Sequence, residues 1–428
     1  MTVIERWQSE IEQPTEGFFA AFAARLTEPG GLRDGVREAV KVLIPRIDWE
    51  AYQPHMPHGI LGLRAVFRLR PLLAEASFRR LLAVQLHMAA HEGRRAAPLK
   101  AATGSGSWRN LEDFIRARRP ALAYAEAQGF EAPDPGDFAR LGALVAPDMA
   151  NVGHKAVLAD HLGDLVDLLE RPRATGRRLF GLAAWLAAMP EDTFWHRRAS
   201  TRLEGAGAGF PEGGTPEVEA LAPLVREVCD LGLVELLDRF AARVKAGLPL
   251  ADLRAALVLA ASEKLLDARR DLEGKTAWTL VYLATLVRTG ARDPRLWAQA
   301  AALVNLFPTD EAEDRVAPRL PVAPATTEAL LDAVLDAEGP EAMGQAQALV
   351  VAGQGDAVLR VLAEAASRND PTFNHAHQVL AVAAAADLQP GLPGFAQGAM
   401  LVALAKSLAN SQGSGDLGRR ADRVLAGA

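Results

Sequence analysis

Histidine is the residue type in this chain whose positions most directly suggest chemistry. The chain has nine histidines, and His58, His154 and His377 each begin a long apolar segment with helical periodicity. His55 and His375 lie close to two of them. A neutral imidazole serves as a general base or as a metal ligand near pH 7. If the segments pack with their starts together, we expect the imidazoles to converge on one cavity as a catalytic site. The alternative is that each histidine only caps its helix.

Four more residues are candidates for binding a substrate in the same cavity. His161 lies two helical turns after His154 and therefore shares its face. Trp278 and Tyr282 are four residues apart on a predicted helix whose segment begins at Lys275. We expect the two rings to form a stacking wall, with His161 and Lys275 also facing the substrate. Ordinary core packing is the alternative for the aromatic residues.

Two groups of histidines have a spacing that suits a metal ion. His87 and His91 are four residues apart in QLHMAAHEG, so they share a helix face. A pair supplies only two ligands, and a helix C-terminus favours a charged imidazole without any metal. His154 and His161, with Asp164 nearby, form a second group that can bind a metal or relay a proton. The alternative for Asp164 is a solvated helix carboxylate.

Familiar cofactor-binding and catalytic motifs are missing from the sequence. It has no GxGxxG that opens a βαβ unit, no GxxxxGKS or GxxxxGKT, no CxxC pair, no HExxH and no GxSxG. The glycine-rich GSGS at residues 104–107 follows no predicted strand, so we expect a flexible connection there and not a phosphate cradle. Flavin and nicotinamide folds use such turns in parallel sheets. We therefore expect no tightly bound cofactor.

Composition predicts an all-α fold. Half of the 428 residues are apolar and only 6% are aromatic, so Ala, Leu and Val fill the core, and strand formers are scarce. The net charge of -6 argues against a nucleic-acid partner. The single cysteine, Cys229, is predicted to be an inert buried thiol in a reducing compartment. Without a signal region or a long apolar run, we expect no membrane span and a cytoplasmic protein.

Four segments share one order of elements: an apolar helix, a break that contains proline, and a second apolar helix. They begin at His58, His154, Lys275 and His377, and the prolines at their breaks are Pro71, Pro172, Pro294 and Pro390. Proline cannot continue a helix, so each segment is predicted to be an antiparallel helical hairpin. We expect a helical bundle or irregular α-array with a possible fourfold divergent internal repeat. The alternative is a chain of unrelated antiparallel helices.

The Gly- and Pro-rich stretch LEGAGAGFPEGGTP lies almost at mid-chain. Such composition is typical of a linker. It predicts an N-terminal helical half at residues 1–205, a linker at 206–216 and a C-terminal helical half at 217–428. The two halves can also pack as one body.

Three short stretches resemble the questin oxidase-like family. PHGILGLRAVFRL, which contains His58, is similar to a histidine–glycine helix start of that family. The segment from His154 and the stretch NHAHQVLAV at Asn374 are similar to its second and late histidine helices. The resemblance implies a Baeyer–Villiger-type oxidation of an aromatic polyketide such as an anthraquinone, with O2 as co-substrate and no bound flavin. It implies His58 as the base, His154 and His377 as its partners, and a second histidine or Lys275 as the group that stabilises an oxyanion.

These observations favour an oxygen-using, flavin-free monooxygenase of secondary metabolism that acts on an aromatic small molecule. Two other interpretations stay open. One is a metalloenzyme in which His87, His91 and one of the hairpin-start histidines hold iron or another first-row metal. The other is a non-catalytic helical-repeat scaffold whose concave face binds a protein or peptide.

Overall fold

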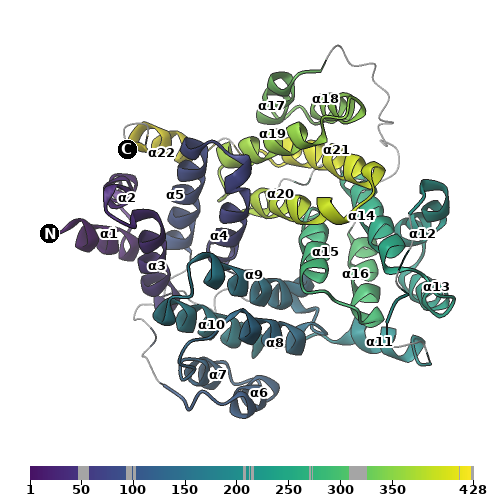
Figure 1. Ribbon diagram of the computed structural model, residues 1–428, viewed down its shortest axis with the longest axis horizontal. Coiled ribbons are helices and arrows are strands. Elements are labelled where there is room, and N and C mark those ends of the chain that lie inside the picture. Colours follow the sequence, from purple (N-terminus) through teal and green to yellow (C-terminus); the bar gives the residue numbers. More distant parts are fainter. Residues whose placement is uncertain are drawn as a thin grey trace. The chain divides into compact units, whose positions relative to one another are not determined.

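The computed structural model describes residues 1–46, 57–92, 99, 103–205, 209–211, 213, 216–268, 271, 273–307, 325–413 and 415–425. Within these ranges the chain consists of α-helices and short 3-10 turns, with no strand (Figure 1). The all-α prediction is therefore confirmed. No helix in the described part of the chain is long and apolar enough to cross a membrane. His55 and part of the expected linker (206–208, 212, 214 and 215) lie outside the described residues.

The chain divides into two compact units that do not coincide with the expected halves. Unit 1 comprises Met1–Phe67, Glu75–Asp192 and Gly415–Ala428, and unit 2 comprises Arg68–Ala74 and Thr193–Ser414. The C-terminal helix α22 (Leu417–Leu425) returns to pack on helices of unit 1, whereas α11 (Phe194–Arg202) packs on helices of unit 2. The Gly- and Pro-rich composition at mid-chain predicted a boundary there. The division between the units instead depends on which helices pack together, and composition does not show that.

Unit 1 packs its helices around an aromatic and alanine-rich core. Trp7 is fully buried, and its indole donates a hydrogen bond to the Gly35 carbonyl. The helices are α1 (Val3–Glu12), α2 (Phe18–Thr27), α3 (Gly31–Leu43), α4 (His58–Leu69, which continues into unit 2), α5 (Glu75–His91), α6 (Trp108–Arg116), α7 (Pro120–Ala127), α8 (Pro135–Val145), α9 (His154–Leu168), α10 (Arg173–Ala187) and α22.

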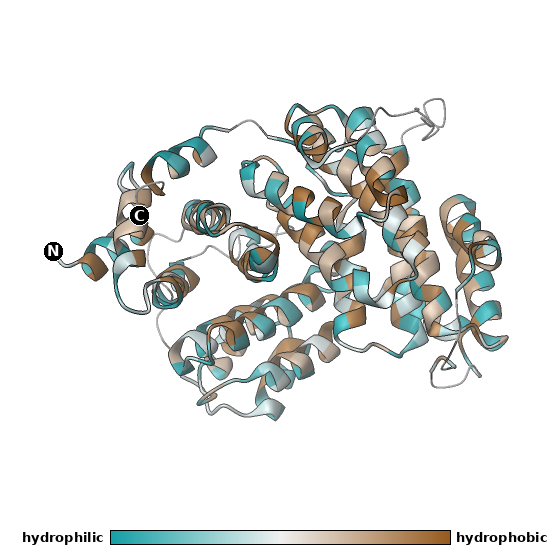
Figure 2. Cartoon of the chain, turned by 45° about the horizontal axis from the view of Figure 1, so that its top comes forward, coloured by the Kyte–Doolittle hydropathy of each residue, from teal (hydrophilic) through white to brown (hydrophobic). Residues whose placement is uncertain are grey.

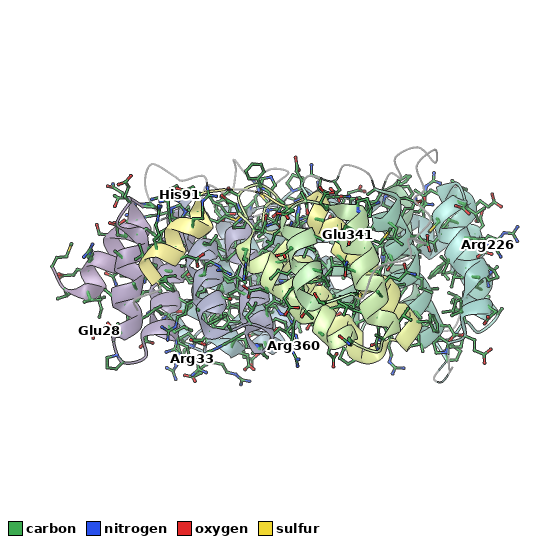
Figure 3. All side chains as sticks on the ribbon, turned by 90° about the horizontal axis from the view of Figure 1, so that it is seen from above. Glu28, Arg33, His91, Arg226, Glu341 and Arg360 are labelled. Atoms are coloured by element: carbon green, nitrogen blue, oxygen red, sulfur yellow. The ribbon has the colours of Figure 1, made fainter. Side chains whose placement is uncertain are left out.

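Unit 2 combines deeply buried helices with helices that are exposed along one side. In α20 almost every residue is buried, and in α21 the stretch 400–409 is buried throughout, which the Ala- and Leu-rich runs at 377–388 and 394–410 explain. The other helices are α11, α12 (Val218–Asp230), α13 (Leu233–Lys245), α14 (Leu250–Asp267), α15 (Trp278–Arg288), α16 (Pro294–Leu306), α17 (Thr327–Leu335), α18 (Gly339–Val351) and α19 (Gly355–Arg368). Figure 2 shows hydrophobic and hydrophilic residues interleaved along the helices. Charged side chains such as Arg226, Glu341 and Arg360 are exposed (Figure 3).

All four predicted hairpins are present as consecutive helix pairs: α4/α5, α9/α10, α15/α16, and α20 (His377–Leu388) with α21 (Gly394–Asn410). Each predicted proline lies at the break. Pro71 and Pro390 lie in the 3-10 turns Arg70–Leu72 and Gln389–Gly391, Pro172 precedes α10, and Pro294 begins α16. The first and fourth pairs have the same helix lengths, 12 and then 17 residues. The origin of the four pairs by duplication stays a prediction.

Glycine allows α4 to pack unusually close to α5. A Cβ atom on Gly59 would lie 2.4 Å from the Ala89 Cα, and one on Gly62 would lie 2.4 Å from the Gln85 amide nitrogen. A side chain at Gly59 would therefore push the helices apart, and one at Gly62 would displace the Gln85 side chain. The close contact at Gly59 holds the first turn of α4 against α5, and His58 is the first residue of that turn.

Candidate functional site

His58 and His154 meet inside unit 1. They are the first residues of α4 and α9, and their Nε2 atoms are 3.2 Å apart. The ring planes are almost perpendicular, at 82°. The two residues are only 6% and 5% exposed. The structure thus brings the first residues of these two hairpins together in a site with little exposure to solvent.

The tautomer of His154 follows from its hydrogen bond. Its Nδ1 lies 2.5 Å from the Asn151 carbonyl oxygen. A carbonyl can only accept, so Nδ1 carries the proton and Nε2 keeps its lone pair. That lone pair is on the nitrogen next to His58 Nε2. The pair can therefore share a proton between the two Nε2 atoms, or direct two lone pairs at one cation.

The backbone before His154 is strained. Asn151 and Val152 have φ angles of 52° and 51°, and Gly153 has 82°, so three consecutive residues are left-handed. A β-branched residue such as valine rarely adopts this conformation. Strain of this kind concentrates at functional sites, where the surrounding structure holds it. The turn places Asn151 beneath the imidazole that it orients.

The start of α4 is held by two polar side chains of the α5 region. Gln85 donates hydrogen bonds to the carbonyls of His58 and Gly59, at 3.0 and 2.9 Å. Glu92 accepts the Gly59 N–H at 2.6 Å. Burial raises the pKa of Glu92 to about 8, opposed by the hydrogen bonds from the Gly59 and His58 backbone. Neither residue was predicted as part of the site. A polar Gln85 inside an apolar helix was the one available signal.

His161 and Asp164 connect α9 to α4. His161 is buried and its Nδ1 lies 3.3 Å from the Leu61 carbonyl, so it donates to the backbone of α4. Asp164 accepts from Arg64 at 2.6 Å in an ion pair. Both contacts fix the crossing of the two helices whose first residues form the histidine pair. The role of His161 in substrate binding stays a prediction.

His87 and His91 belong to an aromatic stack in unit 1. The His87 ring stacks on Phe19 (5.3 Å between centroids, 16° between planes) and meets Phe18 edge-on. The His91 ring lies 4.0 Å from the His87 ring, and its Nδ1 is 2.9 Å from the His87 carbonyl oxygen. The two rings therefore face one another instead of presenting nitrogen edges to a common point. His91 is exposed (Figure 3). The metal hypothesis for this pair stays a prediction.

In unit 2, His377 shares two features with His154: its Nδ1 bonds to a backbone carbonyl, and left-handed residues precede it. Its Nδ1 lies 2.7 Å from the Glu273 carbonyl, which again leaves Nε2 with the lone pair. The two residues before it, His375 and Ala376, are left-handed, with φ angles of 51° and 61°. Burial lowers the pKa of His377 to about 4, so the ring is neutral at pH 7. That His377 acts together with His58 and His154 stays a prediction.

The predicted stacking residues also lie in unit 2. The Trp278 ring is 6.0 Å from the His377 ring. Tyr282 is fully buried, its hydroxyl has no hydrogen-bond partner in the described part of the chain, and burial raises its pKa above the usual range. Lys275 is exposed and paired with Glu273 at 2.5 Å. Trp278 is thus placed beside a histidine, whereas the Lys275 ammonium already has a carboxylate partner.

Residues 104–107 differ from the flexible connection that we expected. The backbone N–H groups of Ser105 and Ser107 donate to the Glu126 carboxylate at 3.2 and 2.6 Å, and the Ser105 hydroxyl donates at 2.5 Å. Glu126 is 5% exposed. These hydrogen bonds lower its pKa against the opposing effect of burial, which is the larger single influence. The loop thus binds an anion through its backbone N–H groups, and that anion is the Glu126 carboxylate of the same unit. Sequence spacing gave no sign of that partner.

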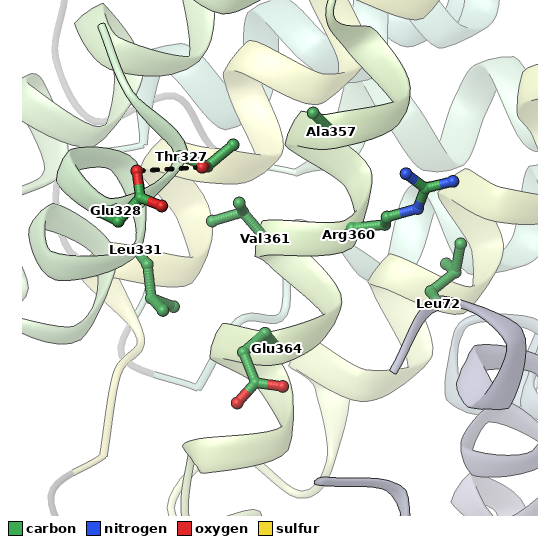
Figure 4. A pocket seen from close by; sticks show the side chains of 8 residues that line it. All are labelled: Leu72, Thr327, Glu328, Leu331, Ala357, Arg360, Val361 and Glu364. Atoms are coloured by element: carbon green, nitrogen blue, oxygen red, sulfur yellow. Dashed lines mark hydrogen bonds between the residues drawn. The ribbon is translucent and has the colours of Figure 1, made fainter. Parts of the chain in front are cut away.

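A surface groove in unit 2 contains none of the predicted residues. It has a volume of about 420 Å³ and lies along α17 and α19 (Figure 4). Its lining is Leu72, Thr327, Glu328, Leu331, Ala357, Arg360, Val361 and Glu364. The groove mixes aliphatic and charged side chains and its lining includes no histidine, so it lacks the imidazole base of the predicted chemistry.

No protein-family model, curated protein or solved structure matches this chain. The resemblance to the questin oxidase-like family stays a prediction for the same reason. The His58–His154 pair is the feature of the described residues that bears most directly on function.

Proposed function

We propose that this chain is an oxygen-using, flavin-free enzyme that oxidises an aromatic small molecule of the polyketide type. One observation supports it above the others: two buried imidazoles meet at their Nε2 atoms, 3.2 Å apart. The hydrogen bond from His154 to Asn151 leaves a basic nitrogen at that meeting point. A strained backbone beside a buried titratable pair is typical of catalytic sites.

The pair suits removal of a proton from a phenol. His58 takes the proton as general base, and His154 shares the resulting positive charge through the short contact between the rings. The phenolate is electron-rich and transfers electrons to O2. A hydroquinone plus O2 then gives the oxygen-inserted quinone product plus one water. One oxygen atom is inserted into the substrate, and the two protons and two electrons of the hydroquinone reduce the other atom to water. The sequence resemblance supplies the substrate class, and His377 and Lys275 are the further residues that it assigns.

Isotope labelling tests this proposal. The purified chain is mixed with a chemically reduced, hydroxylated anthraquinone under ¹⁸O2, and the product is analysed by mass spectrometry. We expect one labelled oxygen in the product and the other in water. A product that carries no label, or no product beyond that of the protein-free reaction, would refute the proposal.

A metal centre is the second candidate for the same pair. Two imidazole ligands that lie about 2.0–2.1 Å from one ion, next to each other in its coordination shell, have nitrogens roughly 3 Å apart. The observed 3.2 Å fits that spacing. A ligating histidine usually donates its other N–H to a carbonyl or carboxylate, as His154 does to Asn151. Inductively coupled plasma mass spectrometry of the untagged protein decides: about one equivalent of iron, manganese or zinc, lost in His154→Ala, would favour the metalloenzyme.

The scaffold interpretation predicts neither result. A protein-binding array would show no oxygen chemistry and no stoichiometric metal, and His58→Ala would leave its binding unchanged. The two experiments above therefore separate all three functions.

A further inference from the structure

The left-handed turn before His154 needs an external restraint. Asn151, Val152 and Gly153 have φ/ψ angles of 52/46, 51/38 and 82/11 degrees. Val152 is the least suited of the three because its Cβ is branched. Val152 is 36% exposed, so its side chain is only partly packed. Contacts elsewhere must keep the turn in this conformation.

An ion pair flanks the turn on both sides. Asp148 precedes it and Lys155 follows it, and the Lys155 ammonium lies 2.5 Å from the Asp148 carboxylate. The two residues are 4% and 3% exposed. The other carboxylate oxygen of Asp148 accepts the N–H groups of Ala150 and Asp192, at 2.8 and 2.9 Å. The pair thus bridges the two ends of the turn directly.

The same pair attaches the turn to the end of α10. Lys155 also donates to the carbonyls of Met189 and Pro190, at 2.8 and 3.0 Å, so all three ammonium protons are used. The Met149 N–H donates to the Asp192 carbonyl at 2.7 Å. A buried, fully bonded ion pair has one preferred geometry, and removal of one partner leaves the other charge unpaired.

The restraint has a direct effect on His154. The Asn151 carbonyl accepts both the backbone N–H and the Nδ1–H of His154. An Asn151 carbonyl turned elsewhere would leave the imidazole free to adopt the other tautomer, with its proton on the nitrogen that faces His58. The orientation of this one carbonyl therefore decides which nitrogen is basic.

We propose that the Lys155–Asp148 ion pair is a positioning device that holds the left-handed turn and thereby fixes the tautomer of His154. This inference rests on the proposed function of the histidine pair. Asp148 and Lys155 act through Asn151 and take no part in the reaction. A merely structural ion pair would stabilise unit 1 without any effect on the imidazole proton.

Nitrogen-15 NMR of the full chain, labelled at histidine, separates these roles. Long-range proton–nitrogen spectra report which ring nitrogen is protonated, and His154→Gln assigns the signal. Asp148→Asn keeps the acceptor for Ala150 but removes the charge that pairs with Lys155. We expect the single Nδ1–H signature of His154 to change into a mixture of both tautomers. If Asp148→Asn does not fold, Lys155→Gln takes its place, because Gln can still donate to the carbonyl of Met189.

Two further variants control the result. Glu38→Gln breaks another buried pair of unit 1, in which Arg25 donates two hydrogen bonds of 3.0 Å. It should lower the melting temperature and leave the His154 signal unchanged. Val152→Gly in the Asp148→Asn background should restore the signature, because glycine adopts the left-handed conformation without strain.

The possible failures are distinguishable. A wild-type His154 protonated on Nε2 would contradict the proposed function itself. A wild-type Nδ1–H signature that persists in Asp148→Asn would overturn only the positioning role. A mixed signal in Asp148→Asn that Val152→Gly fails to restore would also overturn it, because strain in the turn would then not be what the ion pair opposes.

Discussion

Acid should weaken unit 1 through His87, and replacement of this residue by phenylalanine should remove that weakness. The ring stacks on Phe19, and its Nδ1 has no hydrogen-bond partner among the described residues. Burial lowers the pKa of His87 to about 3, and the positive charges of His91 and Arg420 add to the effect. The pKa of the unfolded chain is near 6.5, so the unfolded state binds the proton more tightly. Stability is therefore highest above pH 6.5 and falls as the pH drops towards 3.

The size of the effect follows from these two pKa values. Between pH 8 and pH 5, a shift from 6.5 to about 3 removes at most about 2 kcal/mol from the free energy of unfolding. The ring is only partly buried, so solvent screening reduces this to about 1–2 kcal/mol. His87→Phe keeps the aromatic packing and does not titrate. Between pH 8 and pH 5 its free energy of unfolding should therefore fall by about 1–2 kcal/mol less than that of the wild type.

Urea unfolding followed by circular dichroism at pH 8, 6 and 5 measures the difference. Phe22→Leu is the control, since it removes packing from the fully buried Phe22 of the same core without a titratable group and should lower stability equally at each pH. If the free energies of unfolding of the wild type and His87→Phe fall equally between pH 8 and pH 5, His87 is not the source of the acid sensitivity.

Two further predictions concern buried carboxylates of unit 1. Glu126→Gln should lower the free energy of unfolding by about 2–3 kcal/mol at pH 7, because hydrogen bonds to a charged group are worth about 1.5–3 kcal/mol each and the amide cannot accept from all three donors. The pKa of Glu126 is lowered by folding, so this difference should shrink below pH 4.5. Urea titrations at pH 7 and pH 4 check both parts, and equal stability at pH 7 would contradict them. Glu92→Gln should act in the opposite direction, because the pKa of Glu92 is raised to about 8 and the buried carboxyl favours its protonated form. Relative to wild type, the variant should gain stability as the pH rises from 5 to 8, measured by thermal melting, and a constant difference across that range would count against it.

The parts of the fold that sequence could predict are those set by local chain chemistry. Helix periodicity and the prolines at positions 71, 172, 294 and 390 gave the helix pairs, because proline disfavours continuation of a helix, although Pro223 lies inside α12. The division into units could not be found in this way. It depends on where α22 and α11 pack, which is a property of distant surfaces.

The same distinction applies to the site. The position of His58 and His154 at helix starts was visible in the sequence, since the apolar segments begin there. The supports were not visible. Glu92 and Gln85 act on a helix that is distant in sequence, and the left-handed turn contains a valine, which rarely adopts that conformation. The 104–107 loop was predicted without its partner Glu126 for the same reason.

Oxygen consumption by His58→Ala tests the central claim most directly. The assay compares the initial rate of O2 uptake with a hydroxylated anthrahydroquinone between wild type and the variant, with His196→Ala as the control. His196 is a half-buried histidine that bonds to Gln299. We expect His58→Ala to lose about 10²–10⁴-fold in rate, as removal of a general base does, and His196→Ala to keep the wild-type rate. A His58→Ala protein with full turnover would contradict the assignment of the histidine pair as the catalytic centre.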